Sequence, residues 1–290
     1  MNMKEHIIEN DLLRATVSDA GAELCSVIDR ERNLERIWTA DPAVWNRHDP
    51  ILFPFVGKVT EGKYRVGDRE YPMKTQHGFA RDMDFECVGE TPDSVSHRLS
   101  ASDWTRERYP FEFSLTVTHR LEGKRLSVSW LVENKGGERM YFAIGGHPGF
   151  LMPEGVKKED CRIAFPGAES LCYRNASKAG FALPDLKTLS LEGGSAPYGK
   201  DVPDTWIFED GQVKEVGILL PDGKPYVTLH CAAFPMLAVW ANPAGPFICL
   251  EPWFGRTDDE GFRGTINEKK AIQSLEKGEK KEYGYSVDFR

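Results

Sequence analysis

Residues 111–132 read FEFSLTVTHRLEGKRLSVSWLV, and this stretch decides the class of fold. Apolar residues alternate with polar residues over 111–121 and again over 126–132. Alternation of this kind is typical of a β-strand that has one buried face and one solvated face. The residues between the two runs, Glu122-Gly123-Lys124, predict a turn, so the stretch as a whole predicts an antiparallel hairpin.

Shorter runs of the same kind recur along the chain, with turn residues between them. We expect further strands at residues 12–17, 23–28, 140–144, 205–208, 216–220, 226–231, 236–240 and 247–251. No window of about 12 residues carries a helical apolar stripe, and the helix candidates are the short segments 42–46 and 104–108. The sequence therefore predicts an all-β fold, a large antiparallel β-sandwich.

Nothing in the sequence marks a boundary between domains. Residues 152–203 are weakly patterned and rich in glycine, proline and charge, which predicts long surface loops without the composition of a linker. The chain has no internal repeat of fixed period. We therefore expect residues 1–290 to form a single domain.

The composition excludes several classes of partner. The chain has 37 basic and 45 acidic residues, a net charge of −8 and a pI near 5.5, which argues against nucleic acid because phosphates are neutralised by basic residues. No apolar run approaches the length of a membrane helix, and the N-terminus has no signal-peptide core. We expect a cytoplasmic protein without a membrane partner, and the sequence leaves its oligomeric state open.

The cysteines are scattered and form no C-x-x-C pair. A chain of this length without an export signal rarely needs disulfides. We interpret all six as buried apolar thiols, namely Cys25, Cys87, Cys161, Cys172, Cys231 and Cys249.

Three segments depart from the alternating pattern: QHGFARD at 76–82, GGHPGF at 145–150 and FICLEPWFGR at 247–256. A single histidine is more often structural than catalytic, but His77 and His147 are flanked by glycines, which permit a ligand to approach closely. His119 lies in the apolar phase of its strand with no glycine nearby, so we expect a packed structural residue.

Glu251 is the carboxylate that the sequence singles out. It shares a strand face with Phe247 and Cys249, and Pro252 holds it in an extended conformation, which should project the acid from the end of the strand. The aromatic neighbour Trp253 should desolvate the carboxylate and raise its pKa, as a general base requires. Pairing with a buried arginine is the alternative.

Other kinds of site have weaker support. Two histidines and a carboxylate could bind a metal, but they come from widely separated segments without ligand spacing, so we expect none. The chain has no G-x-S-x-G nucleophile elbow, no phosphate-binding loop and no dinucleotide fingerprint.

Taken in order, the three segments resemble the aldose 1-epimerase (mutarotase) family, especially its bacterial LacX-like branch. The segments AGAEL at 20–24 and FPFVGK at 53–58 extend the resemblance over almost the whole chain. It implies a galactose mutarotase-like β-sandwich whose concave face binds a monosaccharide. It also implies that Glu251 is the general base, that His147 is the general acid and that His77 holds or polarises the sugar.

The resemblance also implies residues that bind the sugar. Arg81 matches the arginine four positions after His77, and Asp204 is similar to the family's acceptor for a sugar hydroxyl, although the match around it is looser. Lys58 stands where many relatives have arginine. Lysine lacks the planar, two-pronged guanidinium, so the resemblance does not decide whether Lys58 contacts the sugar. Candidates for stacking on the sugar are Trp253, Phe79 and Trp206.

We therefore expect an isomerase that interconverts the anomers of an aldose without a cofactor, since one acid and one base are sufficient. Three alternatives remain: the same reaction on a hexose 6-phosphate held by Lys58, Arg81 and Arg256, a non-catalytic carbohydrate-binding protein, or a glycoside hydrolase. The last normally needs two carboxylates, and the sequence singles out one.

Overall fold

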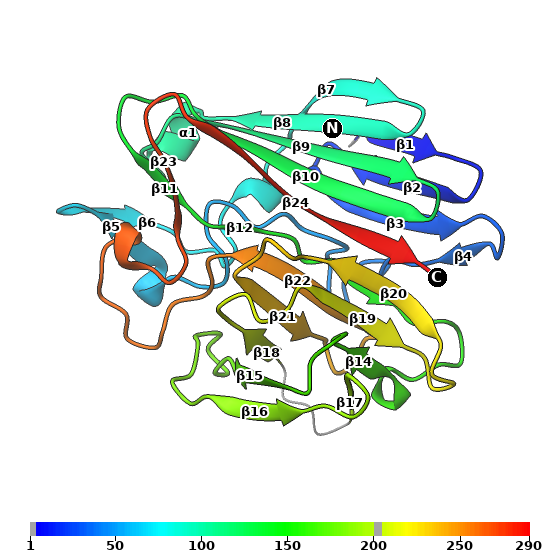
Figure 1. Ribbon diagram of the computed structural model, residues 1–290. Coiled ribbons are helices and arrows are strands. Elements are labelled where there is room, and N and C mark those ends of the chain that lie inside the picture. The colour runs from blue at the N-terminus through cyan, green and yellow to red at the C-terminus, as the bar shows by residue number, and fades with distance from the viewer. Residues whose placement is uncertain (1–3, 200–204) are drawn as a thin grey trace.

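The computed structural model describes residues 4–199 and 205–290, and antiparallel β-sheets dominate it (Figure 1). The largest sheet of this described part has nine strands in the order β17-β14-β19-β20-β24-β10-β9-β8-β7. Their bounds are Ser195–Pro197 (β17), Arg162–Ala164 (β14), Glu215–Leu219 (β19), Pro225–His230 (β20), Lys280–Phe289 (β24), Arg125–Asn134 (β10), Phe113–Glu122 (β9), Ser94–Ser100 (β8) and Glu86–Thr91 (β7).

Two further sheets and two short ribbons complete the β-structure of the described residues. The first sheet consists of β1 (Glu5–Glu9), β2 (Leu13–Ser18), β3 (Leu24–Asp29) and β4 (Leu34–Glu35). The second consists of β12 (Ile144–Gly145), β22 (Phe247–Phe254), β21 (Met236–Trp240), β18 (Thr205–Phe208), β15 (Ser170–Arg174) and β16 (Lys187–Ser190), and β13 (Gly149–Leu151) also pairs with β22. The ribbons are β5 (Lys63–Val66) with β6 (Arg69–Pro72), and β11 (Met140–Phe142) with β23 (Gln273–Leu275).

Helical structure is confined to short segments of the described chain. They are the α-helix α1 (Asp103–Arg106) and the 3-10 turns η1 (Thr60–Gly62), η2 (Ala80–Asp82), η3 (Lys158–Asp160) and η4 (Ile266–Glu268). None of the helices in the described residues is long and apolar enough to cross a membrane.

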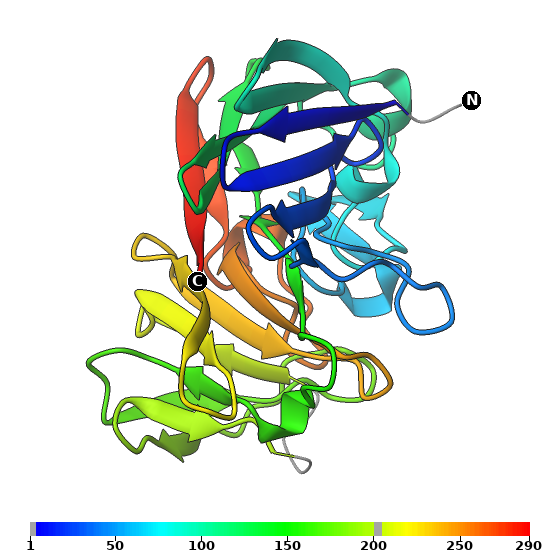
Figure 2. The same ribbon diagram turned by 90° about the vertical axis from the view of Figure 1, so that its right-hand side faces the viewer.

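The nine-stranded sheet extends from one end of the molecule to the other, and the two smaller sheets cover different halves of it (Figures 1 and 2). The sheet β1–β4 lies against the half that contains β7 to β10, and the sheet around β22 lies against the half that contains β14 to β20. This arrangement confirms the prediction of an all-β antiparallel sandwich.

The hairpin that the sequence predicts at 111–132 is confirmed as β9 and β10, which pair antiparallel along their whole length. The apolar positions of both strands are buried; for example, Val117 and the indole of Trp130 are cross-strand partners and both are fully buried. Apolar surface removed from water stabilises the fold by about 25 cal/mol per Å², so this face anchors the large sheet.

The structure corrects the reading of residues 152–203 as long surface loops. The described part of this stretch contains β14, β15, β16 and β17, and β14 lies inside the nine-stranded sheet. These strands have three to five residues each, which is too short for an alternating pattern to stand out. Sequence analysis also missed β24, whose first residues are charged and exposed.

Two smaller predictions have mixed outcomes. The helix candidate at 104–108 is confirmed in part as α1, whereas residues 42–46 form turns because nothing continues them as a helix. All six cysteines are free as we expected, but Cys172 is exposed, Cys25 and Cys87 are half-buried, and the remaining three are buried.

We predict that His119→Asn lowers the free energy of unfolding by roughly 1–3 kcal/mol. His119 is buried, and desolvation lowers the pKa of its imidazole to about 3, so the smaller asparagine would leave unfilled space and a buried amide. Urea denaturation measures the loss. Arg120→Asn, on the exposed face of the same strand, is the control, and an equal loss in both variants would contradict the prediction.

Candidate active site

Glu251 lies inside β22, and the chain brings His147 against it. The loop that carries His147 joins β12 to β13, and both of these short strands pair with β22, so the loop crosses directly over this strand. The His147 Nε2 lies 3.1 Å from the Glu251 Oε2. The two atoms are not aligned as a hydrogen bond, and the Glu251 Oε2 has no hydrogen-bond partner among the described residues, so it retains capacity for a hydroxyl of a ligand.

The expectation that Glu251 projects from the end of a strand is wrong. The strand β22 continues through Pro252 to Phe254, and Glu251 is opposite Ala238 of β21. Proline is tolerated here although it lacks an N–H, and its carbonyl accepts a hydrogen bond from the Gly146 N–H at 3.2 Å. The carboxyl is therefore held within a sheet, where it is 1% exposed.

The glycines before His147 serve close packing. A Cβ atom at Gly145 would lie 2.5 Å from the indole of Trp253, and one at Gly146 would lie 2.8 Å from the ring of Tyr285. Both distances are too short for a side chain, so glycine is what allows the loop to reach Glu251.

Asp49 supports the same loop, and sequence analysis did not find it. Its Oδ1 accepts a hydrogen bond from the backbone N–H of His147 at 3.1 Å, and its Oδ2 accepts one from the Tyr285 hydroxyl at 3.0 Å. Desolvation in this buried position raises the pKa of Asp49 to about 7. Asp49 thus fixes the backbone of His147 by a hydrogen bond.

His77 lies on a strained turn and is the second histidine of the site. His77 and Gly78 both have left-handed backbone conformations, and a Cβ atom at Gly78 would lie 2.2 Å from the Phe53 carbonyl oxygen. The Gly57 N–H donates to the His77 Nδ1 at 3.1 Å, which assigns the ring proton to Nε2. The rings of His77 and His147 are 5.4 Å apart and nearly perpendicular.

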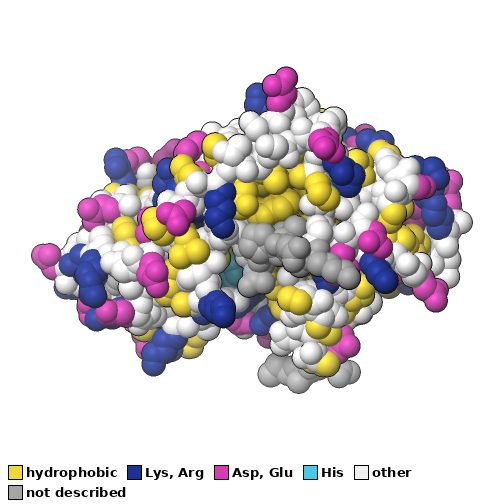
Figure 3. Space-filling view, turned by 90° about the horizontal axis from the view of Figure 1, so that it is seen from below, with side chains coloured by type: hydrophobic (Ala, Val, Ile, Leu, Met, Phe, Trp, Pro, Cys, Tyr) yellow, Lys and Arg dark blue, Asp and Glu magenta, His cyan; other side chains and the backbone are white. Residues whose placement is uncertain are grey.

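These residues line a cleft of about 520 Å³, within the range of small-molecule sites. Six of the seven site residues predicted from the sequence line it together: Glu251, His147, His77, Arg81, Lys58 and Trp253. The seventh, Asp204, lies outside the described residues. On the face of the molecule shown in Figure 3, a histidine ring is visible in a recess with Lys and Arg side chains near it.

Of the three aromatic residues proposed for stacking, Trp253 lines the cleft and the other two do not. Trp45 and Trp240 line the cleft, and their rings lie 5.0 and 5.5 Å from the ring of His147. Trp206 and Phe79 are instead buried core residues. No local pattern identifies Trp45 or Trp240, because each comes from a different segment and meets His147 only in the fold.

Burial determines the charges of the site. Desolvation, strengthened by the nearby Asp49, raises the pKa of Glu251 well above its usual value, although the Trp253 indole opposes the shift in part. Desolvation also lowers the pKa of His147 to about 3 and that of His77 well below its usual value. Both shifts favour the neutral forms, a protonated Glu251 beside an unprotonated His147, and such a pair has one proton to transfer, as a general acid and a general base require.

Metal binding at this pair is a weak fit. His147, Cys249 and Glu251 place ligand atoms within 4.8 Å of one another, a proximity that the sequence spacing did not indicate. Desolvation raises the pKa of the Cys249 thiol well above its usual value, which disfavours the thiolate that a metal requires.

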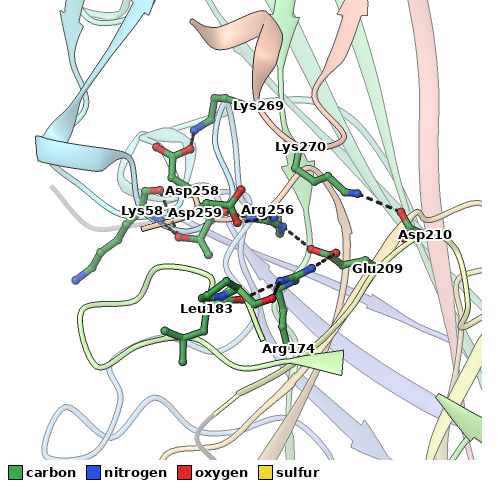
Figure 4. Close-up of polar contacts among 12 residues, drawn as sticks. Lys58, Arg174, Leu183, Glu209, Asp210, Arg256, Asp258, Asp259, Lys269 and Lys270 are labelled. Carbon is green, nitrogen blue, oxygen red and sulfur yellow. Dashed lines mark hydrogen bonds and ion pairs between the residues drawn. The ribbon is translucent and has the colours of Figure 1, made fainter. Parts of the chain in front are cut away.

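An ion-pair network forms the wall beside the cleft (Figure 4). The Arg256 guanidinium donates to Glu209 at 2.6 Å and to Asp259 at 2.8 Å, and Arg174 donates to Glu209 at 3.0 Å. Glu251 itself has no arginine partner among the described residues, because the basic side chain beside it is His147, so this alternative for Glu251 is wrong.

The same network corrects the proposed phosphate cradle. Arg256 is buried and committed to these carboxylates, and it does not line the cleft. Lys58 does line it, with its backbone carbonyl accepting from the Asp258 N–H at 3.1 Å and its ammonium group unpaired among the residues that the structure describes.

Comparison with known sequences places the chain in a family. Residues 4–190 match the family described as aldose 1-epimerase. The chain belongs to the aldose 1-epimerase family. It is 30% identical over 261 residues to the chromosomal protein LacX of Lactococcus lactis subsp. lactis, a match that covers 86% of this chain and 87% of the relative.

Solved structures of this family have the same fold. A galactose mutarotase related enzyme from Lactobacillus acidophilus superposes with a TM-score of 0.93 at 29% identity, covering 99% of this chain and 97% of the other. A galactose mutarotase-like protein from Lactobacillus casei ATCC 334 gives a TM-score of 0.91 at 32% identity, covering 99% and 100%. The fold is thus that of the galactose mutarotase-like sandwiches.

We predict that Asp49→Asn changes the pH dependence of stability. The folded state raises the pKa of Asp49 to about 7, so it binds this proton more tightly than the unfolded state does. The stability from this proton is complete below pH 4 and is lost as the pH rises through 7, by up to about 4 kcal/mol. Asparagine does not titrate and should lack this loss.

Urea denaturation between pH 4 and pH 8 measures the difference between the wild type and Asp49→Asn. Asp222→Asn is the control, because Asp222 is exposed and its pKa is lowered by Lys224, which gives no loss toward high pH. Parallel curves for the wild type and Asp49→Asn would contradict the prediction.

Proposed function

We propose that this protein is an aldose 1-epimerase that interconverts the α and β anomers of a free hexose or a related aldose. The observation that carries the proposal is the contact of a buried Glu251 carboxyl with the His147 ring at 3.1 Å, beside a cleft. A protein that only bound carbohydrate would have no need for such a pair, whose burial is costly.

The reaction needs one base and one acid. The base removes the proton of the C1 hydroxyl while the acid protonates the ring oxygen, and the ring opens to the free aldehyde. Rotation about the C1–C2 bond and closure from the other face give the second anomer, with the roles of base and acid reversed. A positioned acid and a positioned base each contribute about 10²–10⁴ in rate, and no cofactor is required.

The proton inventory of the pair fits this chemistry. When the proton of Glu251 moves to His147, the neutral pair becomes a carboxylate and an imidazolium. Glu251 then acts as the base at the C1 hydroxyl, and His147 acts as the acid at the ring oxygen. Apolar and aromatic walls strengthen these charges by excluding water.

The other residues have proposed roles in binding. The Nε2–H of His77 donates to a sugar oxygen, because its Nδ1 is already occupied by the Gly57 N–H. Arg81 and Lys58 bind hydroxyl groups as cationic donors, and Trp253 forms an apolar wall. We retain Asp204 as a proposed acceptor for a sugar hydroxyl.

A hexose 6-phosphate is the second candidate substrate. Three cationic residues line the cleft, namely Lys58, Arg81 and Lys178, and they could neutralise a phosphate without the committed Arg256. The free aldose and the hexose 6-phosphate differ only in the phosphate group, so a single assay with both substrates separates the two candidates.

The test is a mutarotation assay, by polarimetry or NMR exchange, across a panel of aldoses and their 6-phosphates. Faster anomer exchange than in buffer supports the epimerase, and the preferred member of the panel identifies the substrate. Sugar binding without faster exchange would support the carbohydrate-binding alternative and overturn the proposal.

We predict that Glu251→Gln lowers kcat by about 100-fold or more while KM changes little. The amide retains the shape of the side chain but cannot accept the C1 proton, so the loss falls on the transition state. Glu282→Gln, an exposed exchange on β24, should retain full turnover. If Glu251→Gln keeps more than about a tenth of the wild-type kcat, Glu251 is not the base.

We also predict that EDTA leaves the rate of mutarotation unchanged, because an acid–base pair performs the reaction without a Lewis acid. Polarimetry before and after incubation with the chelator measures this. A loss of rate that a divalent ion restores, in protein that circular dichroism shows to be still folded, would show that a metal takes part in the chemistry.

A further inference from the structure

A second group of metal-ligating side chains lies away from the cleft, where the N-terminal sheet meets the edge of the nine-stranded sheet. It consists of His6 on β1, Cys87 on β7 and His97 on β8. One ligand atom from each residue lies within 4.8 Å of those of the other two. Figures 1 and 2 show β1 beside these edge strands.

The register of the strands produces this group. Cys87 and His97 are direct cross-strand partners, so their side chains share one face of the sheet. His6 occupies an inward position of β1, which has an alternating burial pattern. The rings of His6 and His97 are 5.0 Å apart and nearly perpendicular.

His97 is the observation that points to a ligand. It is completely buried; its Nδ1 has no hydrogen-bond partner among the described residues, and its Nε2 lies 3.2 Å from the Asp19 Oδ1 without the alignment of a hydrogen bond. A buried polar group without a partner is rare and costs free energy.

Two carboxylates surround the histidines. The Asp19 Oδ1 lies 3.0 Å from the His6 Nε2 and 3.2 Å from the His97 Nε2, and the Glu90 Oε2 lies 2.9 Å from the His6 Nδ1. Carboxylates that accept from the second nitrogen of a ligating histidine are a regular feature of metal sites. Their two negative charges would also balance a divalent cation.

We propose that His6, Cys87 and His97 form a binding site for a divalent transition metal of the zinc class, with Asp19 as the orienting carboxylate or fourth ligand. Imidazole, thiolate and carboxylate are the ligands of zinc, at about 2.0–2.3 Å. Tetrahedral ligands at that distance lie roughly 3.3–3.8 Å apart, so the three side chains close in by up to about 1.5 Å. Binding releases one of the two carboxylates from His6 and deprotonates Cys87.

The bound ion would add a further link between elements that the contact of His6 with Glu90 of β7 already joins. It would connect β1 to the hairpin β7–β8, whose outer strand β7 is an edge of the nine-stranded sheet. The site is therefore structural, and it is separate from the chemistry proposed for Glu251 and His147.

The experiment titrates the EDTA-treated full-length chain with Zn²⁺ by calorimetry and with Co²⁺ by absorption spectroscopy. We expect one equivalent of metal, a thiolate-to-cobalt charge-transfer band and a rise in Tm of roughly 5 °C at Zn²⁺ 100-fold above Kd. Cys87→Ser should abolish the charge-transfer band and weaken binding. Because Cys87 is half-buried on an edge strand, this variant keeps the test independent of folding.

His97→Gln should abolish binding of both metals. His230→Gln is the matched control, because His230 also lies between two carboxylates, Glu215 and Asp288, at 3.0 Å each. This control should bind metal as the wild type does.

Glu251→Gln separates the proposed site from the group at the cleft. Loss of binding in Glu251→Gln with unchanged binding in Cys87→Ser would place the metal in the cleft and overturn the proposal. Absence of stoichiometric binding to the wild type would also overturn it.

Discussion

A carboxyl group buried inside a sheet strand is the constraint on which the rest of the site depends. Glu251 is almost completely removed from water, where an ionised carboxylate is costly. It can therefore ionise only beside a group that accepts its proton. The loop between β12 and β13 supplies His147, two glycines let that loop approach, and Asp49 holds its backbone. Each of these features follows from the position of one side chain.

Sequence periodicity predicted the parts of the fold where strands are long or strongly apolar. The hairpin of β9 and β10 and the strands β18 and β21 were found because alternation or apolar composition is visible in one short window. The strands of residues 152–203 escaped because three to five residues carry too little pattern, and β24 escaped because its charged start resembles a solvated surface. Their place is fixed by pairing with distant strands.

The candidate site shows the same limit. Histidines beside glycine and an acid beside aromatic residues are local signals, so His77, His147 and Glu251 were found. Asp49, Trp45 and Trp240 have no such signal, since each becomes part of the site only through contacts between distant segments. Conversely, the hexose 6-phosphate alternative used Arg256, which is instead held by Glu209, a partner that no spacing in the sequence reveals.

The place of β24 has a consequence for biosynthesis. This strand comes late in the chain but lies in the interior of the nine-stranded sheet, between β10 and β20. During translation, both neighbours therefore remain open edges until β24 has been synthesised and has paired between them. Unpaired edges recruit other strands, and non-local pairing of this kind is slow. A chain in which β24 has not yet paired therefore exposes the edges of β10 and β20 to pairing with other strands.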